Sequence, residues 1–248
     1  MSDKSTIPWR KKSDTTKPVI SPEETSKLRE KQTIPWTKIE ETTPQKTKMN
    51  WSVDVMFAID CTGSMSGEIE GVKNAVIDFA NIIDSDGIAI RLGLIEYRDR
   101  VNGEEPVLHK FDSNVFTDKS AQFREQVACL KASGGGPEPE STFDAILLAL
   151  NSIEDASRTN ALVVITDAPP RIPDKECKGV EQLIVEISEM RLDQLYIMYP
   201  HDKSNCAVYQ QLLAGITGES FNLRDGKDSF YDGLISLSHS ISTHTRFG

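Results

Sequence analysis

The strongest constraint on the fold comes from short apolar runs that are too short for buried helices. Residues 53–59 (VDVMFAI) and 160–166 (NALVVIT) are the clearest examples. Runs of this length with few polar residues predict strands buried on both faces, and such strands occur in mainly parallel sheets. Four further strands are predicted, at residues 88–97, 106–111, 194–199 and 219–223.

Helical periodicity follows most of these strands. After the first strand, apolar residues recur at three- and four-residue steps: Ile69, Val72, Val76, Phe79 and Ile83. This spacing predicts an amphipathic helix packed on the sheet. Further helices are predicted at residues 119–132, 142–153, 180–190, 205–216 and 228–243. Alternating strands and helices imply a doubly wound α/β fold: a mainly parallel sheet with helices on both faces and one short antiparallel edge strand.

The first 50 residues differ in composition from the rest of the chain. They are rich in Lys, Thr, Ser, Glu and Pro and lack periodic apolar residues, which predicts a disordered tail before one folded domain at 51–248. The tail holds 11 Lys and Arg and 7 Asp and Glu, while the whole chain has a net charge of −10, so the remainder carries −14. An acidic domain disfavours nucleic acid as the main partner, although the basic tail leaves such a contact open.

The tail contains a near repeat, STIPWRK at residues 5–11 and QTIPWTK at residues 32–38. Each copy sets an isoleucine and a tryptophan beside a proline, with a cation nearby: Ile7, Trp9, Ile34 and Trp36. Tryptophan is a favoured interface anchor, so one hypothesis is a duplicated docking motif for a second, bivalent or oligomeric protein. The alternatives are that both copies pack on the chain's own domain, or that the duplication has no role.

Targeting and redox features favour a cytoplasmic location. No run of about 18 apolar residues predicts a membrane span, and the N-terminal residues 1–12 lack the apolar core of a secretion signal. The four cysteines show no spacing typical of a zinc site or a disulfide framework: Cys61, Cys129, Cys177 and Cys206. Scattered cysteines of this kind indicate a reducing compartment.

The two clearest strands end in oxygen-bearing side chains. Asp60 closes the first run and is followed at two-residue steps by Thr62 and Ser64, while Asp167 closes the run at 160–166. Carboxyl ends of parallel strands meet at one edge of the sheet, where ligands collect. Hydroxyl and carboxylate oxygens suit Mg²⁺ or Mn²⁺, and no His or Cys cluster indicates zinc. The structural alternative is a capped turn in which Ser64 or Ser66 caps the next helix.

Residues 60–64 (DCTGS) resemble the metal-ion-dependent adhesion site of von Willebrand factor type A domains, whose signature is Asp-x-Ser-x-Ser. The resemblance covers residues 53–243 and is closest to an intracellular-type branch that includes the A domains of certain alpha-kinases. It implies two more metal ligands from later loops, Thr142 and Asp167. Ser141 is an alternative to Thr142, although Ser141 could instead be a helix N-cap.

The resemblance also implies a function. In the family the aspartates act largely through water, so the cation keeps an open position for an acidic side chain of a protein partner. We therefore expect a non-enzymatic, metal-dependent interaction or adaptor subunit of an intracellular multiprotein system. The alternatives are a Mg²⁺-dependent phosphoryl-transfer enzyme and a scaffold with a vestigial metal site. Against the enzyme alternative, neither of the two strands that end in aspartate carries there the Asp-x-Asp that a haloacid-dehalogenase-type phosphatase needs, and the sequence has no Gly-rich Lys-Thr/Ser loop for a nucleotide.

Two glutamates and one further aspartate are expected near the same edge. Glu138 and Glu140 lie on a glycine-rich loop before Thr142, and one hypothesis is that one of them fills the open metal position until a partner displaces it. The alternative is a solvated acidic loop. Asp99 follows the strand at 88–97 and could line the same rim, although the sequence favours a surface charge there.

Overall fold

The computed structural model describes residues 52–86, 89–155 and 157–224, together with four helical residues near the C-terminus: Asp232, Gly233, Ile235 and Leu237. The predicted tail, with its two repeated motifs, lies outside the described residues, as does most of the predicted helix at 228–243. Within the part that is described, no helix combines the length and the apolar character that a membrane span requires.

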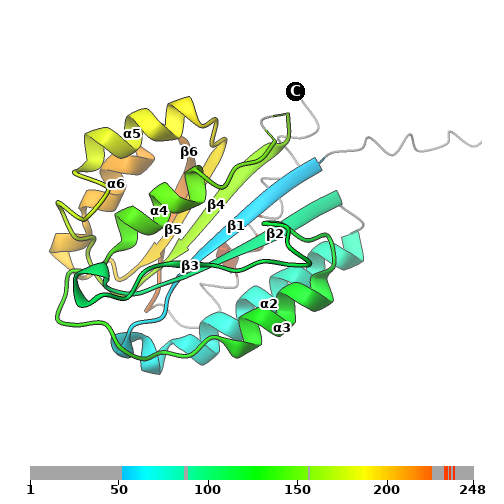
Figure 1. Cartoon of the computed structure of the whole chain (residues 1–248), viewed down its shortest axis with the longest axis horizontal. Coiled ribbons are helices and arrows are strands. Elements are labelled where there is room, and N and C mark those ends of the chain that lie inside the picture. The colour runs from blue at the N-terminus through cyan, green and yellow to red at the C-terminus, as the bar shows by residue number, and fades with distance from the viewer. Residues whose placement is uncertain are drawn as a thin grey trace, which may run out of the picture. The chain divides into compact units, whose positions relative to one another are not determined.

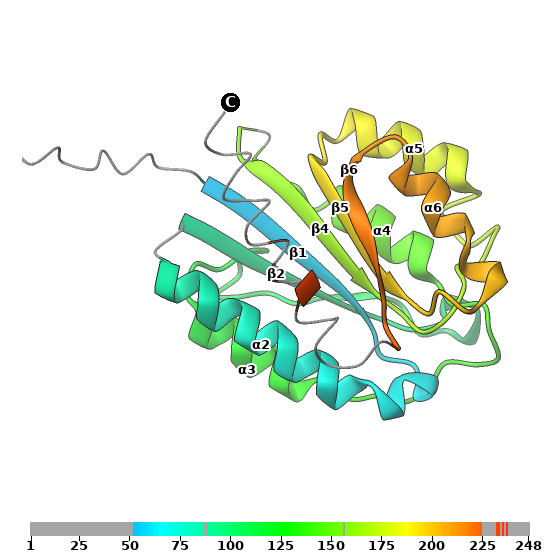
Figure 2. The same cartoon turned by 180° about the vertical axis from the view of Figure 1, so that it is seen from behind.

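Within the described residues, six strands form one sheet in the order β3-β2-β1-β4-β5-β6 (Figures 1 and 2). Their bounds are Ser52–Asp60 for β1, Ala89–Tyr97 for β2, Val107–Leu108 for β3, Thr159–Ile165 for β4, Gln194–Tyr199 for β5 and Thr217–Asn222 for β6. All neighbouring strands pair in parallel except β3, which runs antiparallel to β2 at the edge. The predicted doubly wound α/β fold is confirmed.

Helices cover both faces of this sheet. On one face lie α2 (Ile69–Asp86) and α3 (Ser120–Cys129). On the other face lie α4 (Thr142–Leu150), α5 (Val180–Glu189) and α6 (Val208–Leu213) (Figure 1). Each face therefore has its own apolar core, as a sheet buried on both sides requires.

Strand β1 shows how the sequence serves both cores at once. Val55 and Phe57 belong to the core under α2 and α3, whereas Met56 and Ala58 belong to the core under α4, α5 and α6. This alternation follows the two-residue period of a strand. The ring of Phe57 lies 5.5 Å from that of Phe79, in edge-to-face geometry. Such a buried aromatic pair fixes α2 on the strand.

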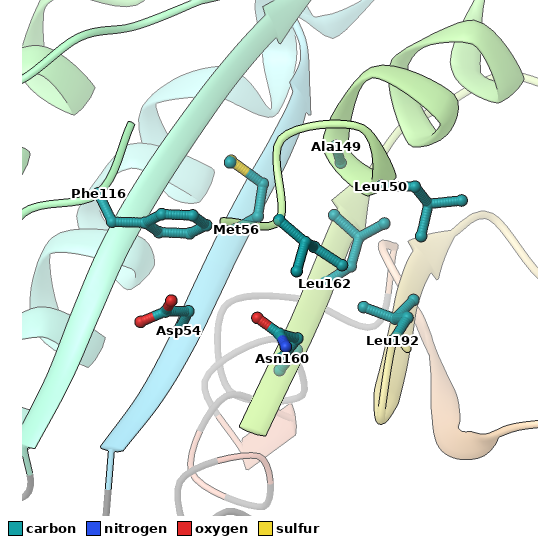
Figure 3. A pocket seen from close by; sticks show the side chains of 10 residues that line it. Asp54, Met56, Phe116, Ala149, Leu150, Asn160, Leu162 and Leu192 are labelled. Carbon is teal, nitrogen blue, oxygen red and sulfur yellow. The ribbon is translucent and has the colours of Figure 1, made fainter. Parts of the chain in front are cut away.

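The amino end of β1 carries a buried acid. Asp54 is paired in register with Asn160 of β4, and Figure 3 shows the two side chains beside each other near a small cavity of about 10 Å³. Arg91 donates to both carboxylate oxygens of Asp54, at 2.9 and 2.5 Å, and Arg158 Nε donates to Oδ1 at 2.6 Å. Two guanidinium groups therefore neutralise this carboxylate inside the fold.

The observed ends of several elements differ from the predicted ones. The predicted strand at 106–111 shortens to the two residues of β3, and the predicted helix at 205–216 divides into a 3₁₀ turn, Ser204–Cys206, and α6. The strand predicted at 219–223 begins two residues earlier, at Thr217. Apolar patterns locate the centre of an element well, but hydrogen bonding decides where it ends.

Candidate metal centre

The predicted site lies between β1 and β4, the point in the sheet where the strand order reverses. The chain runs from β1 to β2 on one side and returns to place β4 on the other, so the carboxyl ends of β1 and β4 are neighbours. Asp60 is the last residue of β1, and Asp167 lies two residues after the end of β4. Ser64 Oγ donates to Asp167 Oδ1 at 3.0 Å and so joins the two loops.

The turn after β1 forms a chain of oxygen atoms. The Thr62 amide and hydroxyl both donate to Asp60 Oδ1, at 2.9 and 2.7 Å, and Thr62 Oγ1 lies 2.9 Å from Ser64 Oγ. Four of the five predicted metal residues are therefore joined by hydrogen bonds: Asp60, Thr62, Ser64 and Asp167. Ser64 lies within the 3₁₀ turn Gly63–Gly67, and its hydroxyl contacts Thr62 and Asp167; the N-cap residue of this turn, Thr62, makes no side-chain cap hydrogen bond.

The two hydroxyl groups in this row of oxygen atoms make three contacts but carry only two hydrogens. Each hydroxyl carries one hydrogen, and the hydroxyls of Thr62 and Ser64 point at the carboxylates of Asp60 and Asp167 respectively. The third contact, between the two hydroxyl oxygens at 2.9 Å, then has no hydrogen left to fill it. Two lone-pair-bearing oxygens at that distance suit a shared cation better than each other.

The electrostatic surroundings of Asp60 also favour a bound cation. The side chain is fully buried, and burial raises the pKa of its carboxyl from 3.8 to about 6, against the hydrogen bonds from Thr62 and Thr166. The charge of Asp167 contributes a small part of this rise. Thr166 Oγ1 donates to Asp60 Oδ2 at 2.8 Å. Among the residues with described side chains, none forms an ion pair with Asp60 or Asp167.

The three consecutive glycines before the acidic loop explain how a third segment reaches the turn. Gly63 N donates to Gly134 O at 3.0 Å. Gly135 has a φ of +73°, and a Cβ there would lie 2.8 Å from Thr62 Cγ2. Gly135 N donates to Glu104 Oε2 at 2.7 Å. Only glycine combines this left-handed backbone with so close an approach.

Thr142 is buried and is separate from the hydrogen-bonded oxygens of Asp60, Thr62, Ser64 and Asp167. Its Oγ1 accepts hydrogen bonds from the hydroxyls of Tyr97 and Tyr209, at 3.3 and 3.2 Å, and no hydrogen bond within the described part joins it to the other four predicted ligands. The Tyr209 hydroxyl also lies 2.9 Å from Ala168 O, next to Asp167. Ser141 makes no side-chain cap bond to α4; its Oγ accepts from Arg100 N at 2.9 Å.

The two glutamates of the loop have different surroundings. Glu138 is paired with the ammonium group of Lys203, whose Nζ also donates to Asp167 O at 2.7 Å. Glu140 is only 1% exposed, so the solvated-loop alternative is wrong for this residue. Burial, together with the smaller effect of the charges of Asp60, Asp99 and Asp167, raises the pKa of the Glu140 carboxyl from 4.5 to about 8.

The prediction of a surface charge at Asp99 is wrong. Its side chain is 1% exposed, and the guanidinium of Arg171 donates to both carboxylate oxygens, at 3.2 and 2.8 Å. Val101 N and Asn102 Nδ2 complete its hydrogen bonds. The error has a simple origin: the neutralising arginine lies 72 residues away in the sequence and on a different loop.

Several residues at this edge escaped the sequence analysis. Thr166 could have been found from the sequence, because it is the last residue of the predicted strand at 160–166 and directly precedes the predicted ligand Asp167. Tyr97, Tyr209 and Lys203 gave no signal, since their roles depend on contacts between distant segments. Within the described residues, no group of three His, Cys, Asp or Glu side chains forms a metal-binding cluster, so a candidate cation here depends on hydroxyl ligands as well.

Comparison with known proteins identifies the family. The model of the von Willebrand factor A domain matches residues 54–212. The chain belongs to the von Willebrand factor A domain family. Members of this family are typically protein-interaction modules without enzymatic activity, and they bind protein partners.

Two curated relatives of this A domain are longer proteins. The alpha-protein kinase vwkA of Dictyostelium discoideum is 26% identical over 235 residues, which are 94% of this chain and 33% of the kinase. The putative ariadne-like RING finger protein R811 of Acanthamoeba polyphaga mimivirus is 29% identical over 119 residues, 48% of this chain and 11% of that protein. The chain thus spans a third or less of the length of these relatives.

Solved structures show the same fold. The pilus adhesin SpaC from Lactobacillus rhamnosus GG, in its open conformation, matches with a TM-score of 0.57 and 13% sequence identity, over 77% of this chain and 30% of the adhesin. A second structure of the same adhesin gives a TM-score of 0.55 at 14% identity, with the same coverage. At this level of identity the likeness concerns the fold alone.

Proposed function

We propose that this A domain binds a protein partner through a divalent cation, Mg²⁺ or Mn²⁺, and serves as an interaction or adaptor subunit of an intracellular, cytoplasmic multiprotein system. The observation that carries the proposal is the hydrogen-bonded chain of oxygens from Asp60 through Thr62 and Ser64 to Asp167. It joins two loops that lie 103 residues apart in the sequence. A metal-ion-dependent adhesion site of this family would be built from such a chain.

The residues present fit a hard cation. The donors are carboxylates and hydroxyls, which suit Mg²⁺ and Mn²⁺, and the two hydroxyls have fewer hydrogens than contacts. Asp60 is buried without an ion-pair partner in the described part of the chain, a situation that costs free energy unless a cation neutralises the carboxylate.

Each residue has a distinct role in this proposal. Asp60, Thr62, Ser64 and Asp167 would hold the cation, and Thr166 would orient the second oxygen of Asp60. Thr142 would support the centre through Tyr209, which contacts the loop that carries Asp167. When bound, the cation would supply positive charge that attracts an acidic side chain of the partner.

Calorimetry on the full chain tests the proposal directly. Mg²⁺ should bind the wild-type protein, and Asp60→Asn should abolish the binding. Asp78→Asn is the matched control, because Asp78 is exposed on α2 and its loss should leave Mg²⁺ affinity unchanged. A wild-type chain that takes up neither Mg²⁺ nor Mn²⁺ at millimolar concentration would overturn the proposal.

The tail would provide a second contact. The repeated motifs, with Trp9 and Trp36 as anchors, would hold a second protein independently of the metal. Replacing both tryptophans with alanine should therefore remove that protein from complexes without changing Mg²⁺ affinity. The kinase activity named for the Dictyostelium relative does not favour an enzyme here, because this chain spans only 33% of that protein.

A further inference from the structure

An apolar groove lies between α5 and α6, the two neighbouring helices that Figure 1 shows side by side on one face of the sheet. Its volume is about 300 Å³, and its apolar lining comes from both helices and from the segments that follow them: Ile184, Ile187, Leu192, Leu212 and Ile216. Ile184 is 41% exposed, so the groove opens to solvent. Pockets that hold a small ligand begin at about this volume, so the groove has room for an apolar side chain of a partner.

The groove and the candidate metal centre lie at opposite edges of the sheet. Leu192 comes just before the amino end of β5, and Ile216 directly precedes the amino end of β6. Asp60 and Asp167 lie at the carboxyl ends of β1 and β4, which run parallel to β5 and β6. A strand of six residues, such as β5, is about 20 Å long. A molecule in the groove therefore leaves the metal centre free.

Arg191 is the one charged residue in the lining of this groove. Seven of the eight arginines in the described part of the chain form an ion pair with a carboxylate: Arg91, Arg98, Arg100, Arg124, Arg158, Arg171 and Arg224. Arg191 is the eighth, and it forms no ion pair with any described residue. The nearby carboxylate of Asp193 instead accepts a hydrogen bond from Asn160 N at 2.7 Å.

The backbone at Arg191 is unusual for an arginine. Its φ is +56°, and it follows Met190, the C-cap residue of α5. Leu192 N donates to Ile187 O at 3.2 Å, which is the closing hydrogen bond of a Schellman motif. Glycine is the usual residue at the left-handed position of this motif, because any other side chain is strained there. Strain of this kind is found mainly at positions that serve a function.

We propose that the groove between α5 and α6 is a second docking site, which binds a segment of a protein partner in which an apolar side chain stands beside a carboxylate. The apolar side chain fills the groove between Ile184 and Leu212, and the carboxylate pairs with Arg191. Charge complementarity favours an acid, because α6 carries no charged residue and none of the three glutamates of α5 lines the groove. An arginine can bind such a carboxylate through two parallel hydrogen bonds.

This site does not depend on the metal. Because the two sites lie at opposite edges of the sheet, one domain can hold one protein at the metal centre and another in the groove. The groove thus gives the domain a way to join two proteins even when no cation is bound.

A phage-displayed library of random linear peptides, selected on the full chain in EDTA, supplies the probe. The selected peptides should share an aspartate or glutamate beside a leucine, isoleucine or phenylalanine. Ile184→Asp should weaken their binding at least ~10-fold, measured by fluorescence polarisation, as expected for a residue at the centre of an interface. Val185→Asp is the matched control: Val185 is exposed on the same helix but does not line the groove, so affinity should stay within about two-fold.

Substitutions at Arg191 separate binding from helix termination. Arg191→Gly should raise the melting temperature, because glycine is unstrained at this φ, and should weaken peptide binding at least ~10-fold, because the ion pair is lost. Arg191→Lys keeps the charge and should lose less affinity than Arg191→Gly. An arginine that serves only to end α5 would give the higher melting temperature without the loss of binding, and this result would overturn the proposal.

Three other outcomes would also overturn it. Selected peptides that bind Ile184→Asp as tightly as the wild type would show that the groove is not the docking site. Affinity for the peptides that rises at least ~10-fold when Trp9 and Trp36 are both replaced by alanine would assign the groove to the chain's own tail. A wild-type dimer in sedimentation that Ile184→Asp converts to a monomer would assign the groove to a second copy of the chain.

Discussion

Strand β1 carries a buried aspartate near each end, and the two have opposite surroundings. Asp54, near the amino end, lies between Arg91 and Arg158, which supply three hydrogen bonds to its oxygens. Asp60, at the carboxyl end, is equally buried but receives its hydrogen bonds from the backbone and from hydroxyl groups of Thr62 and Thr166. One acid is neutralised within the fold, and the other is not.

The difference teaches how to distinguish a structural acid from a candidate ligand. Both residues lie near an end of the same apolar strand, and both are at most 1% exposed. With its pKa raised from 3.8 to about 6, a charged Asp60 costs on the order of 3 kcal/mol at pH 8. A fold that keeps such a cost at one end of a strand while neutralising the other end is consistent with an external cation at the costly end.

The largest expected effect comes from removing each acid in turn. Asp54→Asn should lower the free energy of unfolding by about 3 kcal/mol, because it leaves two arginines without their carboxylate. Asp60→Asn should stay within about 1 kcal/mol of wild type in EDTA at pH 8, since the lost hydrogen bonds are offset by the removal of a buried charge. Urea denaturation measures both. Equal destabilisation by the two variants would break the comparison.

The stabilisation of the protein by Mg²⁺ should depend on pH. In EDTA, the stability that protonated Asp60 contributes is fully present below pH 3.8 and is lost as the pH rises through about 6; Glu140 extends the same loss to about pH 8. Metal competes with these protons. Saturating Mg²⁺ should therefore raise the melting temperature by roughly 6–10 °C at pH 8 and by much less at pH 5. A shift that is the same at both pH values would contradict this.

Two glycine substitutions test how the glycine segment 134–136 approaches the site. Gly135→Ala should destabilise the protein by about 1–2 kcal/mol, because its φ of +73° is strained for alanine and the new Cβ would contact Thr62. It should also weaken Mg²⁺ binding. Gly71→Ala is the matched control: it lies in α2, with no atom within 4 Å of an added Cβ, and should stabilise by about 0.5–1 kcal/mol. Unfolding by urea would show whether the signs differ.

The smallest effect is expected at Lys203. Its ammonium group contacts the backbone oxygen of Asp167 and the Glu138 carboxylate at a partly exposed position. Lys203→Met should change stability by less than about 1 kcal/mol. It should strengthen Mg²⁺ binding by about two-fold, because a positive charge near the site is lost. Calorimetry at low and high salt would show that the gain in Mg²⁺ affinity becomes smaller as the salt concentration rises. A variant that binds Mg²⁺ more weakly than wild type would contradict the prediction.

Sequence patterns predicted the sheet because its central strands are unusually apolar. The runs at 53–59 and 160–166 differ from the observed β1 and β4 by only one residue at each end. Patterns failed where local sequence carries less information. The polar composition of β6 and the mixed run at 205–216 left their boundaries open, and tertiary hydrogen bonds decided them.

The candidate site was predictable to the extent that its residues share short segments. Asp60, Thr62 and Ser64 lie within five residues, and the strand-end rule adds Asp167. The surroundings of Thr142, Glu140 and Asp99 were not predictable, because two tyrosines, a buried loop and a distant arginine determine them. Such partners become visible only when the chain is folded.

Crystals of the full chain grown with Mn²⁺ and measured at the manganese absorption edge would test the central claim most directly. The account predicts one strong anomalous peak at the carboxyl ends of β1 and β4, with Ser64 Oγ about 2.1–2.2 Å away, as expected for an oxygen ligand of such a cation. Well-ordered density for Asp60, Ser64 and Asp167 with no anomalous peak among them would contradict it.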